Sequence, residues 1–332
     1  MAEALYRRDD FARAAELFGR LGRRAMQEKL ESFRGQRPYE LESEGEGFKE
    51  TQVKWVLTDP LPVVEARIDD GKLVNFFIDT GGAELIVDRQ LAEELGIRIF
   101  GWEPVTEDLQ LGHGRLDKFE LGGLPVRNVP VHILDVRQFS GPVFGGLRVD
   151  GVIGTVFLYH FLATLDYPRG ELVLRPRTEE ALRSFEQEAC SPSLGSGAIV
   201  VPFWLAGDHF ILAWGTINRS RPMLFLVDTG LAGKAFLAPR STLDELRITP
   251  DESRATEGLT IYGKVREVPF HIEELTLGEA REHDLEGVTG SLRVENLFGF
   301  RIAGLISHQF FRGYALTLDF QRMRLFLVRT SG

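Results

Sequence analysis

Apolar positions along this 332-residue chain follow two different periods. Over residues 4–35 they recur at helical spacing among Arg, Glu and Gln side chains, as between Phe11 and Phe18. From about residue 51 the chain changes to short apolar runs separated by glycine-containing turns. These patterns predict a mostly β protein with a small α-helical segment at its N-terminus.

The β-rich part contains the same order of elements twice. In its first half we predict three strands and a helix, at residues 52–57, 63–68, 73–78 and 89–95. The second half repeats them, at residues 199–205, 209–214, 223–227 and 241–246. Asp70-Gly71 is expected to join two strands in a turn, and Gly96 is expected to end a helix.

One short signature ends the third strand of each half. Residues 76–81 read Phe-Phe-Ile-Asp-Thr-Gly, and residues 224–230 read Leu-Phe-Leu-Val-Asp-Thr-Gly. A carboxylate at the end of a buried strand is costly unless a partner or a function uses it. An Asp that forms a turn would explain one copy but explains a matched pair poorly. We therefore expect Asp79 and Asp228 to face each other.

Further blocks recur in the same order at nearly one offset. Asp79 and Asp228 are 149 residues apart. The Gly-Val-Ile-Gly block at residues 151–154 matches Gly-Leu-Ile-Ser at 304–307, and Thr-Leu-Asp recurs at 164 and 317, both at an offset of 153 residues. Recurrence of three blocks in one order indicates a duplicated domain.

With this order of blocks, the chain resembles the retropepsin-like aspartic protease family. The resemblance covers roughly residues 52–176 and 198–328. It implies two tandem acid-protease β-barrel lobes in one chain, arranged as in bilobal pepsin-like enzymes. It also implies that Asp79 and Asp228 are catalytic, share one proton, and activate a water molecule that attacks a peptide bond. Such chemistry needs neither a metal ion nor a cofactor.

The family resemblance assigns roles to the residues that follow each aspartate. The hydroxyl groups of Thr80 and Thr229 are expected to form hydrogen bonds across the lobe interface beneath the carboxylates. Gly81 and Gly230 are expected to let backbone N–H groups approach the carboxylates. A β-branched residue suited to a strand end and a plain turn glycine are the simpler interpretations.

The family also implies a mobile hairpin, or flap, over the substrate in each lobe. The candidates are Leu111-Gly112-His113-Gly114-Arg115 in the first lobe and Ile261-Tyr262-Gly263-Lys264 in the second. An ordinary glycine hairpin is an equally good interpretation of each, and Tyr262 is either a substrate contact or an exposed hairpin side chain.

Two features depart from the family pattern. Ser307 stands where its counterpart Gly154 keeps the expected glycine, which predicts a distortion behind Asp228. Gly82 and Leu231 follow the two signatures, where relatives usually carry Ala or Ser. Loss of a hydroxyl there is expected to alter the pKa values of the carboxylates, and Leu231 is large for a position near substrate.

The predicted domains are a helical segment with a linker at 1–50, lobes at 51–177 and 198–332, and an interlobe linker at 178–197. The helical segment resembles part of a tetratricopeptide repeat, and such repeats need stacked neighbours. Either upstream repeats precede it or its helices pack on the first lobe, which we favour. The segment is also a candidate site for a protein partner.

Charge and composition exclude several classes of partner and location. The formal charge of −10 argues against nucleic acid or an anionic membrane as the main partner. No apolar run is long enough to cross a bilayer, and no signal peptide is recognisable, which predicts a cytoplasmic protein if Met1 is the natural start. Cys190 allows no internal disulfide, and the seven histidines lack paired metal spacing and are assigned to structure or surface.

The sequence therefore favours an aspartic endopeptidase that acts on polypeptides, as a monomer with both aspartates in one chain. The alternative is a catalytically weak or inactive peptide-binding module whose helical N-terminus recruits partners. A homodimer that mixes lobes between chains is a third arrangement. Retention of two mutually repelling carboxylates favours the enzyme.

Overall fold

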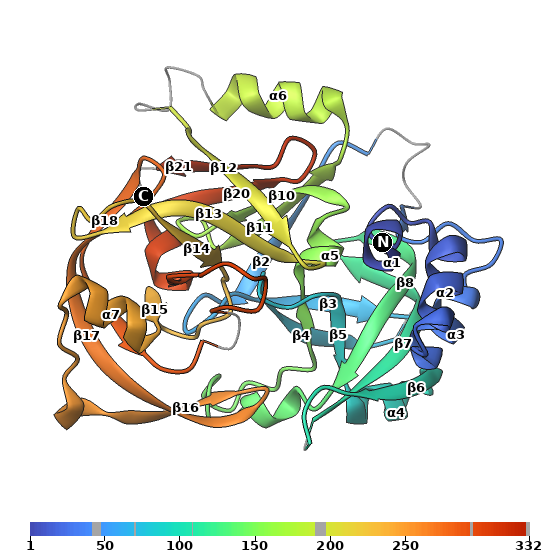
Figure 1. Cartoon of the computed structure of the whole chain (residues 1–332). Coiled ribbons are helices and arrows are strands. Elements are labelled where there is room, and N and C mark those ends of the chain that lie inside the picture. Colours follow the sequence, from blue (N-terminus) through green and yellow to red (C-terminus); the bar gives the residue numbers. More distant parts are fainter. Residues whose placement is uncertain (42–47, 70, 108, 190–196, 293–294, 330–332) are drawn as a thin grey trace.

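The computed structural model describes residues 1–41, 48–69, 71–107, 109–189, 197–292 and 295–329. It is mostly β, with two lobes side by side and a group of short helices next to the first lobe (Figure 1). Cys190 and Asp70, singled out above, lie outside the described residues. Within the described part of the chain, no helix is long and apolar enough to cross a membrane.

The N-terminal segment, predicted to be helical over residues 4–35, forms three short helices: α1 (Ala2–Tyr6), α2 (Phe11–Arg20) and α3 (Arg24–Glu31). The side chain of Asp10 caps α2 by accepting a hydrogen bond from the N–H of Arg13. Gly22 has a φ of 78° and separates α2 from α3. The buried faces of these helices join the core of the first lobe, as favoured above.

The first lobe contains the strands β1 (Glu40–Leu41), β2 (Thr51–Leu57), β3 (Val63–Ile68), β4 (Leu73–Ile78), β5 (Leu85–Asp88), β6 (Ile99–Pro104), β7 (Gln110–Leu121), β8 (Leu124–Leu134) and β9 (Gly151–Ile153). Its helices are α4 (Arg89–Leu95), η1 (Arg137–Phe139) and α5 (Thr155–Leu158). The predicted strands and helix agree with β2, β3, β4 and α4. Gly96 ends α4 in the left-handed conformation, as expected.

The second lobe contains the strands β13 (Phe210–Ile217), β14 (Met223–Val227), β15 (Phe236–Ala238), β16 (Thr256–Thr260), β17 (Gly263–Leu277), β18 (Ala280–Thr289) and β19 (Gly304–Ile306). Its helices are α7 (Arg240–Leu246), η3 (Glu252–Arg254) and η4 (His308–Gly313). The predicted duplication is visible in the strand pairing: β4 pairs in parallel with β9, and β14 pairs with β19 in the same register.

A six-stranded antiparallel sheet joins the two lobes. Its order is β2, β11 (Glu171–Pro176), β10 (Phe161–Asp166), β20 (Tyr314–Asp319), β21 (Arg324–Arg329) and β12 (Ile199–Ala206). At its centre Thr164 is paired with Thr317, and their hydroxyl oxygens lie 2.7 Å apart. The helix α6 (Glu179–Ala189) packs on the outer face of this sheet (Figure 1).

Candidate active site

Asp79 and Asp228 occupy equivalent positions at the ends of β4 and β14. The backbone N–H of Asp79 donates to the carbonyl of Ile153 at 3.0 Å, and that of Asp228 donates to the carbonyl of Ile306 at 3.0 Å. The short strands β9 and β19 therefore hold each aspartate from behind. Each signature leaves a buried apolar strand and turns towards the other lobe, as its sequence predicts.

The two carboxyl groups meet at the lobe interface, close enough for each to influence the pKa of the other. Each lies against the glycine of the opposite signature. A Cβ atom placed on Gly81 would lie 2.2 Å from Oδ2 of Asp228, and one on Gly230 would lie 2.3 Å from Cγ of Asp79. Only glycine permits this approach. The N–H of Gly81 donates to Asp79 at 2.7 Å, and that of Gly230 donates to Asp228 at 2.8 Å.

Thr80 and Thr229 link the two loops beneath the carboxylates. The N–H of Thr80 donates to Oγ1 of Thr229 at 3.1 Å, and the N–H of Thr229 donates to Oγ1 of Thr80 at 3.0 Å. The Thr80 hydroxyl also donates to the carbonyl of Val227 at 3.0 Å, and the Thr229 hydroxyl to that of Ile78 at 3.4 Å. Both threonines are fully buried. The lobes are thus joined at the point where the aspartates meet.

The electrostatics of the pair favour retention of a proton. Burial raises the pKa of Asp79, although hydrogen bonds to its ionised form act in the opposite direction. Burial, followed by the charge of Asp79, raises the pKa of Asp228 well above its ordinary value. Two neighbouring carboxylates do not both ionise easily, so the pair titrates as a unit.

The flap expected in the second lobe is a hairpin. Residues 261 and 262 form the turn between β16 and β17, where Tyr262 is 41% exposed and Gly263 has a φ of 97°. Figure 1 shows this hairpin extending from the second lobe towards the first. Leu259 on β16 packs against an apolar cluster of the first lobe that includes Phe77 and Phe144.

The flap expected at residues 111–115 is wrong in position. Gly112, His113 and Gly114 lie inside β7, which pairs with β6 on one side and β8 on the other. A Cβ atom on Gly112 would lie 2.9 Å from side-chain atoms of Ile133 and Trp102, so this glycine serves close packing between strands. His113 is fully buried. The turn of this hairpin lies between β6 and β7, where the N–H of Val105 donates to the carbonyl of Leu109 at 2.8 Å.

The distortion expected behind Asp228 is also absent from this part of the structure. Strand β19 keeps the register of β9, and the Ser307 hydroxyl accepts a hydrogen bond from the N–H of Leu231 at 3.1 Å. A Cβ atom on Gly154 would lie 2.3 Å from the carbonyl oxygen of Glu84. The corresponding loop of the second lobe, between Asp228 and β15, is two residues longer and leaves room for Ser307.

Two neighbours of the Asp79 loop were not among the predicted site residues. His209, assigned above to structure or surface, lies with Nε2 3.0 Å from the carbonyl oxygen of Gly81. Glu84, five residues after Asp79, is buried with Lys29 from α3. The burial of Lys29 could have been predicted from the sequence, because Lys29 lies on the apolar face of a helix between Met26 and Leu30.

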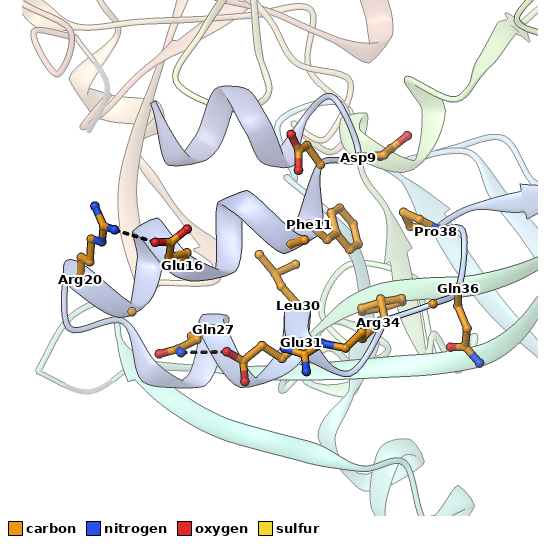
Figure 2. A pocket seen from close by; sticks show the side chains of 15 residues that line it. Asp9, Phe11, Glu16, Arg20, Gln27, Leu30, Glu31, Arg34, Gln36 and Pro38 are labelled. Atoms are coloured by element: carbon orange, nitrogen blue, oxygen red, sulfur yellow. Dashed lines mark hydrogen bonds and ion pairs between the residues drawn. The ribbon is translucent and has the colours of Figure 1, made fainter.

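A groove also lies on the N-terminal helices, away from this site (Figure 2). Its volume is about 670 Å³, and Phe11, Leu30 and Phe33 line it together with polar side chains. Ion pairs and hydrogen bonds such as Arg20–Glu16 lie along its rim. None of its lining residues belongs to the two Asp-Thr-Gly loops. Among the described residues, no group of three or more His, Cys, Asp or Glu side chains is arranged to hold a metal ion.

Comparison with known proteins agrees with this architecture. The sequence model of a family described as aspartyl protease matches residues 64–157 and 213–302, which together make up more than half of the chain. The two matched regions fall in the two lobes. The chain therefore belongs to the aspartyl protease family. No curated protein sequence matches it.

Proposed function

We propose that this chain is an aspartic endopeptidase that hydrolyses peptide bonds with a water molecule activated by Asp79 and Asp228. The meeting of the two carboxyl groups, one from each lobe, is the observation that supports this most directly. Membership of the aspartyl protease family supports a polypeptide as the substrate. The lobes are proposed to span residues 51–177 and 198–332.

In the proposed reaction the pair holds one proton. The ionised carboxylate takes a proton from the water as the water oxygen attacks the peptide carbonyl carbon. The protonated carboxyl group donates its proton to the carbonyl oxygen, and a proton then passes to the leaving amine as the C–N bond breaks. Backbone N–H groups of Gly81 and Gly230, which donate to the carboxylates, keep both acids oriented.

An extended peptide is proposed to bind between the aspartates and the β16–β17 hairpin. Tyr262 and Gly263 at its turn are the proposed flap residues. Leu259 of this hairpin contacts the first lobe, and the hairpin is proposed to cover the bound substrate and exclude water. The buried His113 is not part of this proposal.

Three statements, on the oligomeric state, a protein partner and the location, stay predictions. Both aspartates come from one chain and meet at the lobe interface, which supports a monomer as the active form. The groove in Figure 2 supports a partner-binding role for the N-terminal helices. Mass measurement in solution and localisation in cells would test the predicted monomer and its cytoplasmic location.

The test is cleavage of a peptide library by the wild type and by Asp79→Asn and Asp228→Asn. Asp284→Asn is the matched control, because its side chain is 87% exposed on the surface. We expect both site variants to lose cleavage and keep their fold, and the control and wild type to be equally active and inhibited by pepstatin. Full activity of either site variant would reject the mechanism. Peptide binding by the wild type without cleavage would instead favour the binding module.

A further inference from the structure

His209 reaches across the lobe interface to the loop that carries Asp79. It precedes β13 of the second lobe, yet its Nε2 lies 3.0 Å from the carbonyl oxygen of Gly81 in the first. Its Nδ1 lies 2.5 Å from a carboxylate oxygen of Asp208. The residue is only 9% exposed, and its ring packs on that of Phe210 with centroids 3.9 Å apart. These contacts hold the imidazole in one orientation.

Both hydrogen-bond partners of the His209 ring are acceptors. A carbonyl oxygen and a carboxylate accept hydrogen bonds, and a neutral imidazole carries only one N–H to donate. Only the protonated ring can donate to Gly81 and Asp208 together. The geometry therefore matches an imidazolium cation beside the Asp79 loop.

Asp208 supplies the counter-charge. Burial raises the pKa of Asp208, but the hydrogen bond from His209 and the charge of that ring outweigh burial and lower it to about 2. The carboxylate is therefore ionised at pH values well above 2.

The two lobes differ at this position. The residue 149 positions before His209 is Pro60, which has no ionisable side chain. Its carbonyl accepts a hydrogen bond from the N–H of Gly233 at 3.0 Å, in the loop that follows Asp228. The Asp79 loop thus contacts the His209 ring, whereas the Asp228 loop contacts a backbone carbonyl at the matching position. Asp59, the counterpart of Asp208, pairs instead with His308 and Arg312.

This difference acts on the two carboxyl groups unequally. Burial raises the pKa of Asp79, while the charge of His209 is among the influences that lower it. Burial raises the pKa of Asp228 as well, but His209 lies against the loop of Asp79 and not against that of Asp228. A single proton shared by the pair is therefore more stable on Asp228.

We propose that His209 is a positioning residue that holds the Asp79 loop from the opposite lobe and directs the shared proton to Asp228. Asp79 is then the ionised member, which takes the proton from water, and Asp228 donates to the peptide carbonyl oxygen. These reaction roles rest on the proposed function, but the location of the proton can be measured without turnover.

Other titratable groups also face the His209–Asp208 pair. Burial lowers the pKa of His132 on β8 well below its usual value, and the charges of Lys29 and His209 add to this, so His132 is neutral. Tyr6, Arg7 and Asp9 line the same small cavity as Asp208. Burial raises the pKa of Asp9 to about 7, so Asp208 is the ionised one of these two carboxyl groups at acidic pH.

The first test is NMR titration of the full chain with ¹³C-labelled aspartate carboxyl groups, assigned with Asp79→Asn and Asp228→Asn. We expect Asp79 to ionise at lower pH than Asp228 in the wild type, and ¹⁵N shifts of His209 to report two protonated nitrogens. In His209→Phe, which keeps the packing on Phe210, the ionisation of Asp79 should move up by about half to one pH unit.

His271→Gln is the control, because its side chain is 62% exposed, and it should leave the ionisation of Asp79 unchanged. Earlier ionisation of Asp228, or an Asp79 step that does not move, would overturn the proposal.

The second test is the pH dependence of kcat/KM in the same variants and in His209→Gln. Removal of the cation should move the acidic limb upwards, with about three- to tenfold lower kcat/KM on that limb. A purely structural role would lower activity equally at every pH, and that result would count against the proposal. If the wild type cleaves nothing, the proposed function fails, and the NMR titration still decides the role of His209.

Discussion

Nζ of Lys29 lies 2.8 Å from both carboxylate oxygens of Glu84, and both side chains are almost completely buried. Lys29 belongs to α3, whereas Glu84 ends the loop that begins with Asp79. The hydroxyl group of Tyr6 on α1 donates to the same carboxylate. The N-terminal helices therefore supply the counter-charge for a buried acid in the candidate active-site loop.

Removal of that counter-charge should destabilise the protein. In Lys29→Met, Glu84 would remain as an uncompensated buried carboxylate, and we expect a loss of about 3–5 kcal/mol in the free energy of unfolding. Urea denaturation measures this loss. The double variant Lys29→Met/Glu84→Gln should recover a large part of it, because the unpaired charge is gone. A loss below about 1 kcal/mol in the single variant would show that water reaches Glu84.

A methyl group on Gly81 should impair the site more than the fold. Its Cβ would lie 2.2 Å from Oδ2 of Asp228, so the carboxyl group must move. We expect Gly81→Ala to lower kcat/KM by about 100-fold or more, since catalytic groups tolerate little displacement. Gly141→Ala is the control, because no atom lies within 4 Å of its added Cβ. Equal activity of both variants would contradict the observed proximity.

The hydroxyl of Thr80 should matter more than its methyl group. Thr80→Val removes the acceptor for the buried N–H of Thr229, at a cost of about 1–3 kcal/mol in stability. Thr80→Ser keeps the hydroxyl and should retain most of the stability and the cleavage activity. Thermal denaturation and kcat of the two variants test this. If Ser proves as damaging as Val, packing rather than hydrogen bonding holds the loops together.

Stability should fall with rising pH because of Asp228. Its pKa is raised in the folded state, so above about pH 4 the unfolded chain has released a proton that the folded chain retains. The folded state then binds more protons, and the free energy of unfolding decreases as pH rises. Asp228→Asn removes this contribution and should have a higher Tm than the wild type at pH 7, with little difference near pH 3. A Tm at pH 7 equal to that of the wild type would argue against a strained carboxylate.

The strands around the aspartates could be predicted from sequence because local patterns determine them. The bounds of β3, β4 and β14 agree with the predicted runs, since buried strands of a duplicated lobe read as apolar runs that end at Asp-Thr-Gly. The meeting of the two aspartates also followed from the repeated signature. That expectation required only two facts: a buried carboxylate is costly without a partner, and the Asp-Thr-Gly signature occurs twice.

The errors concern features that depend on packing between elements. The Gly-His-Gly run at 112–114 has the composition of a turn, but Trp102 and Ile133 from neighbouring strands demand small residues there. The fit of Ser307 depends on the length of a loop that lies far from it in sequence. His209 contacts the Asp79 loop only because the two lobes meet, so its sequence neighbours do not predict this contact. Alignment of the two halves places Pro60 opposite His209, which shows only that the halves differ at this position.

The pairing of β10 with β20 has a consequence for how the chain is assembled. Ala163 is paired with Leu318 and Leu165 with Leu316, on either side of the Thr164–Thr317 pair, so equivalent residues of the two copies mirror each other across the seam. Each lobe pairs with the other through the same strand edge that two identical lobes would use to form a dimer. Such an isologous contact is self-complementary. The fused polypeptide thus retains the interface geometry of a symmetric dimer, while each side has been free to change its own residues.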